Sequence, residues 1–109
     1  MSDINPQEAI EFIYRNAPKY AKAKSERVQL EEYRKSKKAI LFQQAPAGSI
    51  ADREAYAYAH EDYVQLLEGL KQAVEIEETL RWQIEAARLK TEIWRTQQAN
   101  NRMIDGAAR

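Results

Sequence analysis

Nine cations between Arg15 and Lys38 are the residues whose type and spacing best suit chemistry with a ligand. They are interleaved with Tyr20 and Tyr33. Cations neutralise phosphates and aromatic rings stack on bases, so this combination is typical of proteins that bind single-stranded nucleic acid. Four of the cations fall between Arg34 and Lys38, so a helix would spread them around its surface and some must project outward. The residues expected to contact single-stranded DNA are Arg27, Tyr33, Arg34, Lys35, Lys37 and Lys38. The alternative is a hairpin whose cations are only solvated or paired within the chain.

Residues suited to catalysis or metal binding are sparse. The single histidine, His60, has no cysteine beside it and no glutamate three residues before it, so a solvated histidine is favoured over a ligand or base. Glu75, Glu77 and Glu78 form an acidic cluster, but it lacks a histidine or a glycine-bearing calcium loop and is typical of a charged helix face. No nucleotide-binding or nucleophile motif is present. The sequence therefore predicts a protein that is not an enzyme and uses no cofactor or metal.

The net charge of zero is the sum of strongly charged segments. Residues 15–38 carry nine basic and three acidic side chains, a net +6, and residues 52–78 carry eight acidic and two basic ones, a net −6. The flanking segments are weaker, at −3 for residues 1–14 and +3 for residues 79–109. Pairing between the two central segments is therefore expected.

Helix-forming residues dominate the chain, which has three glycines, three prolines and no cysteine. Asn5 and Pro6 form a helix start, and Pro18 disfavours helical geometry at the residue before it. The sequence thus predicts a short helix at about 6–16 and a basic helix at 18–44, with Asn16 capping the second.

The only clear loop is 45–48, and Ser49 with Asp52 resembles a capping box. A helix of roughly 50 residues is expected over 50–103, with a frayed tail at 104–109. A short loop makes its flanking helices antiparallel neighbours. The predicted fold is therefore all-α: one domain, residues 1–109, with a short N-terminal helix, an antiparallel helical hairpin and one long C-terminal helix.

Pairing Gln44 with Ile50 and running back along both helices sets the expected register of the hairpin. It places the basic helix beside the acidic segment and brings Glu77 near Arg15 or Lys19. The short N-terminal helix would then lie beside about 79–90.

The C-terminal half of the long helix is apolar on two opposed faces, which requires two covering partners. One face holds Leu80, Ile84, Ala87 and Trp94, and the other holds Trp82, Ala86, Leu89 and Ile93. Because the chain can supply one partner, we expect a homo-oligomer and a coiled-coil-like interface. The residues expected at that interface are Trp82, Ala86, Leu89, Ile93 and Trp94. The alternative is a monomer whose N-terminal segment covers both faces.

The motif Leu80-Arg81-Trp82, followed by the run from Ile93 to Arg102, resembles small helical proteins of tailed phages and prophages. Such proteins are often encoded among recombination and replication genes, and the similarity covers roughly 30–102. The layout also resembles the T-even phage recombination mediator family, although this chain has a shorter connection and an acidic half-helix. The resemblance implies an oligomer that binds single-stranded DNA and helps load a recombinase onto strands coated by single-strand-binding protein. The family's basic run would fall on Arg34, Lys35, Lys37 and Lys38.

The expected function is that of a phage-type DNA recombination or replication accessory protein that binds single-stranded DNA as an oligomer. Its partners would be itself, single-stranded DNA and a recombinase or single-strand-binding protein, with no membrane contact. The N-terminal residues lack a secretory signal, so the expected location is the cytoplasm, that of the bacterial host if the protein is phage-encoded. The alternative is a helical adaptor of protein–protein interactions, or an inhibitor of a host enzyme, that binds no nucleic acid.

Overall fold

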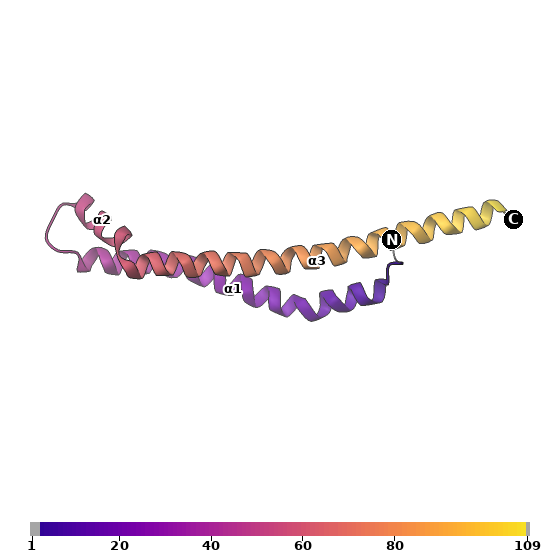
Figure 1. Cartoon of the computed structure of the whole chain (residues 1–109), viewed down its shortest axis with the longest axis horizontal. Coiled ribbons are helices and arrows are strands. Elements are labelled where there is room, and N and C mark those ends of the chain that lie inside the picture. The colour runs from indigo at the N-terminus through magenta and orange to yellow at the C-terminus, as the bar shows by residue number, and fades with distance from the viewer. Residues whose placement is uncertain (1–2, 109) are drawn as a thin grey trace. The chain divides into compact units, whose positions relative to one another are not determined.

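The computed structural model describes residues 3–108, which form three α-helices and no β-strand (Figure 1). The helices are α1 (Pro6–Gln44), α2 (Ile50–Ala59) and α3 (Glu61–Ala108). The all-α helical hairpin expected from the sequence is confirmed. Contacts divide the chain into two compact units: Met1–Ala21 with Thr79–Arg109, called unit 1, and Lys22–Glu78, called unit 2.

Two of the predicted helix caps are present. The side-chain oxygen of Asn5 accepts hydrogen bonds from the backbone N–H groups of Gln7 and Glu8, at 3.0 and 3.2 Å, and Pro6 is the first residue of α1. Ser49 and Asp52 form the reciprocal bonds of a capping box, both at 3.1 Å. These side chains satisfy backbone donors that have no partner within the helix.

The predicted break before Pro18 is wrong, because α1 continues through this proline without interruption. Asn16 lies inside the helix and caps nothing; its side-chain amide donates to the carbonyl of Phe12 at 2.8 Å. Proline removes one helical hydrogen bond, but residues at helical spacing on either side of it, from Ile13 to Tyr20, are half-buried within unit 1. Tertiary packing of this kind commonly overrides a local preference.

The predicted single helix over 50–103 is also wrong, because His60 interrupts it. His60 has an extended conformation (φ −64°, ψ 138°), and its Nδ1 accepts a hydrogen bond from the N–H of Asp62 at 3.0 Å. The histidine therefore caps the start of α3, with Glu61 and Asp62 in the first turn, where the helix dipole favours acids. His60 is half-buried rather than fully solvated.

The helix α3 reaches Ala108, so the frayed tail expected at 104–109 is helical as far as that residue. Gly106 lies inside the last turns and does not end the helix. A helical glycine costs only about 1 kcal/mol relative to alanine, which is too little to terminate a helix that is already propagating.

In unit 2, α1 and α3 pack along a stripe of buried and half-buried residues spaced alternately three and four apart, as in a coiled coil. We call this stripe the seam. Its members are Ala23, Arg27, Leu30, Arg34, Lys37 and Leu41 from α1 and Tyr63, Leu66, Leu70, Ala73 and Glu77 from α3.

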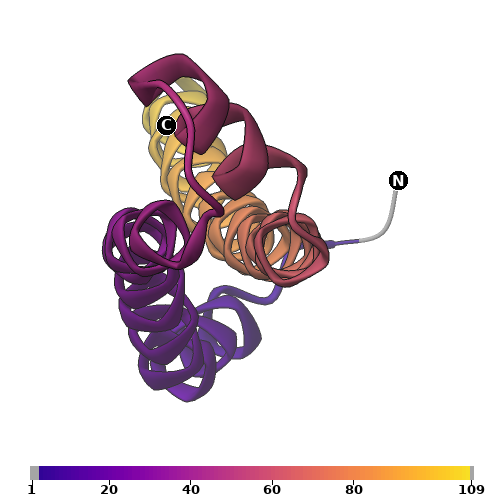
Figure 2. The same ribbon diagram turned by 90° about the vertical axis from the view of Figure 1, so that its left-hand side faces the viewer.

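The core of unit 2 lies at the loop end of the seam. Leu41 (1% exposed) clusters with Ala57 of α2 (0%) and Tyr63 of α3 (7%), and Phe42 packs against them. Figure 2, viewed from the loop end, shows α2 lying across the ends of the two long helices. Only the break at His60 allows α2 to fold back in this way.

The same break shifts the register of the hairpin by ten residues. With Gln44 opposite Ile50, Arg27 would face residue 67, whereas it contacts Glu77. The expected position of Glu77 near Arg15 or Lys19 is therefore wrong. The shift equals the ten residues of α2, which leave the line of α3 and no longer pair with α1.

In unit 1, the first turns of α1 pack with the C-terminal part of α3 (Figure 1). Ala9 and Ala87 are buried, and Ala87 belongs to a stripe of α3 that again alternates in steps of four and three. The half-buried members of this stripe are Leu80, Ile84, Thr91 and Trp94. This is the first of the two apolar faces expected in this part of the helix.

Candidate nucleic-acid interface

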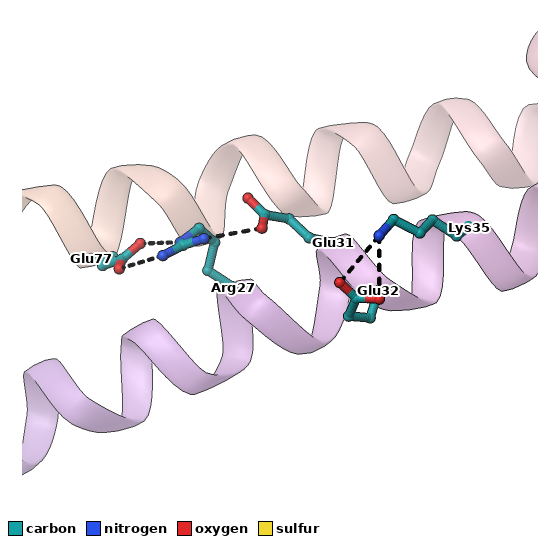
Figure 3. Close-up of polar contacts among 5 residues, drawn as sticks. All are labelled: Arg27, Glu31, Glu32, Lys35 and Glu77. Carbon is teal, nitrogen blue, oxygen red and sulfur yellow. Dashed lines mark hydrogen bonds and ion pairs between the residues drawn. The ribbon is translucent and has the colours of Figure 1, made fainter.

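Arg27, expected to contact DNA, points into the seam and binds acids of its own chain (Figure 3). Its Nη2 donates to Oε1 of Glu77 at 3.0 Å, its Nε donates to the other carboxylate oxygen, and its Nη1 donates to Glu31 at 3.0 Å. Glu77 is only 4% exposed. These hydrogen bonds raise the pKa of Arg27, that to Glu77 most of all, so the guanidinium stays charged. Arg27 is a structural residue here.

Lys37 is also engaged within unit 2. Its ammonium lies 3.4 Å from a carboxylate oxygen of Asp62 in the first turn of α3, and its side chain is mostly covered. Together with the Arg27–Glu77 pair, this contact confirms that the basic part of α1 lies beside the acidic part of α3. Two of the six residues expected at a DNA-binding surface therefore serve the hairpin itself.

Three other predicted cations, Arg34, Lys35 and Lys38, line one open hollow of about 400 Å³ in unit 2. Tyr58 of α2 and Tyr63 of α3 complete its wall. We call these five residues the basic–aromatic hollow. The cations come from consecutive turns of α1, and the fold of α2 over the loop end brings Tyr58 to them.

Aromatic and cationic groups in the hollow contact one another. The Lys38 ammonium lies 4.4 Å from the centroid of the Tyr58 ring, and Tyr58 meets Tyr63 edge to face at 5.4 Å. A hydrogen bond between Lys38 and the Tyr58 side chain raises the pKa of the lysine, which keeps it cationic well above neutral pH.

The remaining two cations of the hollow, Lys35 and Arg34, are not strongly paired with acidic side chains of the described residues, so they can contact a ligand. Lys35 approaches the carboxylate of Glu32 at 3.3 Å, but both side chains are about two-thirds exposed, so this pair is weak (Figure 3). Arg34 forms no ion pair with any residue that the structure describes. The hollow thus offers charge for phosphate oxygens and, in the 47% exposed Tyr58, one ring accessible to a base.

Tyr33 was predicted as the stacking residue, but it does not line the hollow. It is exposed on α1 outside the hollow, and the aromatic residues that line the hollow are Tyr58 and Tyr63. Tyr63 belongs to the seam and to the core at the loop end as well as to the wall of the hollow. Tyr58 gave no signal at all, because its position depends on the break at His60.

The second apolar face of α3 is open in unit 1. Trp82, Leu89 and Ile93 are 59%, 44% and 45% exposed, and Ala86 between them is exposed too. We call these four residues the outer stripe. Trp94, the fifth residue predicted at an oligomer interface, is half-buried on the face that packs with α1.

Charged residues border the outer stripe. Arg88 donates to Glu85 and to Glu92, in each case with a shortest distance of 2.6 Å, and Arg81 lies 5.0 Å from the Trp82 ring. The hydrogen bond from Arg88 to Glu85 lowers the pKa of the Glu85 carboxyl and raises the pKa of the Arg88 guanidinium. Both groups are therefore ionised at neutral pH.

In the part of the chain that the structure describes, no three histidine or acidic side chains gather as a metal ion would require. None of the described helices combines the length and the apolar character needed to cross a membrane. Comparison with known proteins found no matching family model, no matching curated protein and no matching solved structure.

Proposed function

We propose that this protein binds single-stranded DNA at the basic–aromatic hollow and acts as an oligomer. The observation that carries the proposal is the convergence of Arg34, Lys35 and Lys38 with two tyrosines around one open hollow. In keeping with the resemblance to phage proteins, the biological role would be that of an accessory protein in DNA recombination or replication, such as a recombination mediator.

The chemistry of the hollow fits an unpaired strand better than a duplex. Three cations can neutralise about three phosphates, and a tyrosine ring that stacks on a base contributes about 1–3 kcal/mol. Neither contact reads sequence, so binding would be tolerant of base composition. Three phosphate contacts are few, which makes each hollow weak and gives an oligomer an advantage through avidity.

A salt-titrated anisotropy measurement with a fluorescent single-stranded oligonucleotide tests the proposal. Three contacts predict that the logarithm of the binding constant falls with the logarithm of salt concentration with a slope of about −2. Replacing Lys35→Glu together with Lys38→Glu should weaken binding at low salt by about tenfold or more.

The matched control is Lys22→Glu together with Lys24→Glu, which makes the same change of charge on α1 outside the hollow. This variant should weaken binding much less. The proposal fails if the unmodified chain does not bind at low salt, or if both double variants lose affinity equally.

A second candidate function is that of a protein-interaction adaptor that binds no nucleic acid. The engagement of Arg27 and Lys37 within the hairpin favours it, since fewer cations are left for a strand. The outer stripe would then contact a foreign protein. Sedimentation velocity distinguishes the two, because a monomer that also ignores oligonucleotide would support the adaptor.

A further inference from the structure

The outer stripe belongs to a longer heptad pattern that begins at Trp82 and continues to the end of α3. Positions in steps of four and three are Trp82, Ala86, Leu89, Ile93, Thr96, Asn100 and Met103. Towards the N-terminus the same pattern meets only polar residues, such as Glu75 and Thr79. The surface suited to a partner helix is therefore confined to the part of α3 that lies in unit 1.

The identities at these positions specify the kind of partner. In heptad notation, Ala86, Ile93 and Asn100 fall at position a, and Trp82, Leu89, Thr96 and Met103 fall at position d. A β-branched residue at a with leucine at d favours two parallel strands, and a single asparagine at a fixes register and copy number. Ile93, Leu89 and Asn100 match this pattern.

The charges beside the stripe agree with parallel pairing. Glu85 and Lys90 occupy the flanking positions g and e, which face each other between two parallel copies of a helix. Lys90 is exposed and forms no ion pair with any described residue, and the Glu85 carboxylate can accept a further bond beside that from Arg88. An antiparallel pair would instead place Glu85 near Glu92 of the second copy.

We infer that the outer stripe binds the outer stripe of a second copy of this chain, in a parallel two-stranded coiled coil whose register is set by Asn100. The inference rests on the oligomeric part of the proposed function and gives it a surface, an orientation and a copy number. Each α3 would then pack with its own α1 on one face and with the second α3 on the other.

Disulfide trapping tests the orientation directly, because the chain contains no cysteine of its own. Thr96→Cys places a thiol at position d, where the two copies of a parallel pair bring the same residue together. In an antiparallel pair centred on the outer stripe, the two copies of residue 96 would lie roughly 25 Å apart. A disulfide requires Cα atoms within about 7 Å of each other.

The matched control is Gln98→Cys, an exposed position on the opposite side of the helix from the stripe. At micromolar concentration and mild oxidation, Thr96→Cys should form covalent dimers in high yield and Gln98→Cys should not. Equal yields would mean random collision and would overturn the inference.

Sedimentation velocity of the unmodified chain and oligonucleotide binding complete the test. A dimer that fails to crosslink through Thr96→Cys would overturn parallel pairing and leave single-strand binding intact. A monomer would overturn self-association, and the stripe would then belong to a foreign protein. If Thr96→Cys crosslinks as expected but the unmodified chain does not bind the oligonucleotide, the proposed DNA function alone would be overturned.

Discussion

Arg27 and Glu77 form a charged pair inside the seam, where the adjacent seam positions hold alanine or leucine. The guanidinium contacts both carboxylate oxygens, a geometry that holds one helix in a fixed position along the other. Burying two charges lowers the net gain from such a pair, so it contributes more to register than to stability. The break at His60 brings the two residues opposite each other, and their pairing holds unit 2 in that register.

Replacing Arg27→Leu should destabilise unit 2, because the mostly buried Glu77 carboxylate loses its guanidinium partner. We expect the melting temperature, followed by circular dichroism, to fall by more than about 5 °C. Adding Glu77→Leu should recover most of that loss, since two leucines suit a seam position. The control is Glu32→Gln at the exposed Lys35–Glu32 pair, which should change little. A double variant no more stable than Arg27→Leu would contradict this account.

The sequence predicted the parts of the fold that depend on local chemistry. Asn5 and the Ser49–Asp52 box are short-range caps, and each depends only on residues within three positions of it. The predicted helix break before Pro18 and the predicted continuous helix through residue 60 are wrong for the same reason. Whether a helix continues or breaks at such a residue depends on the tertiary packing that follows, which local sequence does not show. Continuing α1 keeps its packing with α3, whereas breaking before α3 lets Ala57 cover Leu41. The adjacent acids Glu61 and Asp62 were the available signal for a new helix start.

The candidate site was predictable in part for the same reason. Arg34, Lys35 and Lys38 come together because they lie within five residues of one helix. Arg27, Arg34 and Lys37 all share a face with the apolar residues of the seam, and this spacing indicates a place in the hairpin for each of them. Arg34 alone of the three also lines the hollow. Tyr58 could not be found, because its contact with Lys38 requires α2 to leave the line of α3.

Truncating Leu41→Ala should destabilise unit 2 by about 2–5 kcal/mol, because Leu41 is 1% exposed and lies between Ala57 and Tyr63. The cost includes both the lost apolar contact and the cavity that remains. Urea unfolding followed by circular dichroism measures it. Leu67→Ala is the control, since Leu67 is 38% exposed and its truncation should cost about 1 kcal/mol or less. Equal effects would show that no core exists at the loop end.

Replacing His60→Ala should join α2 and α3 into one helix, because alanine cannot cap and has the highest helix propensity. His60→Asn retains a capping side chain and should preserve the break. The measurement is the nuclear Overhauser contact between the methyl groups of Leu41 and Ala57, which should disappear in His60→Ala and persist in His60→Asn. Since Tyr58 would leave the basic–aromatic hollow, oligonucleotide binding should weaken in His60→Ala only. Retention of the methyl contact in both variants would contradict the capping role.

Acid should weaken unit 1 through Glu85. Its pKa is lowered in the folded chain by the hydrogen bond from Arg88, so the bridge stabilises the fold above the ordinary value of 4.5 and is lost as pH falls below it. Because the Glu85 side chain is 38% exposed, we expect loss of the bridge at acid pH to lower the melting temperature by less than about 5 °C. Melting curves at pH 7 and pH 3 should differ less for Glu85→Gln than for the unmodified chain. Glu68→Gln, at a glutamate with no ion pair among the described residues, should leave the difference unchanged.

Replacing Asn100→Ile should change the copy number of the oligomer. An asparagine at position a pairs with its equivalent in a two-stranded coil, which weakens association and at the same time excludes other registers and stoichiometries. Isoleucine at that position removes the restriction, so sedimentation velocity should show tighter association together with species larger than a dimer. Asn101→Ile is the matched control, because it makes the same change one residue later and off the stripe. A single dimeric species in both variants would mean that Asn100 does not set the register, whereas monomers in every sample would exclude the interface itself.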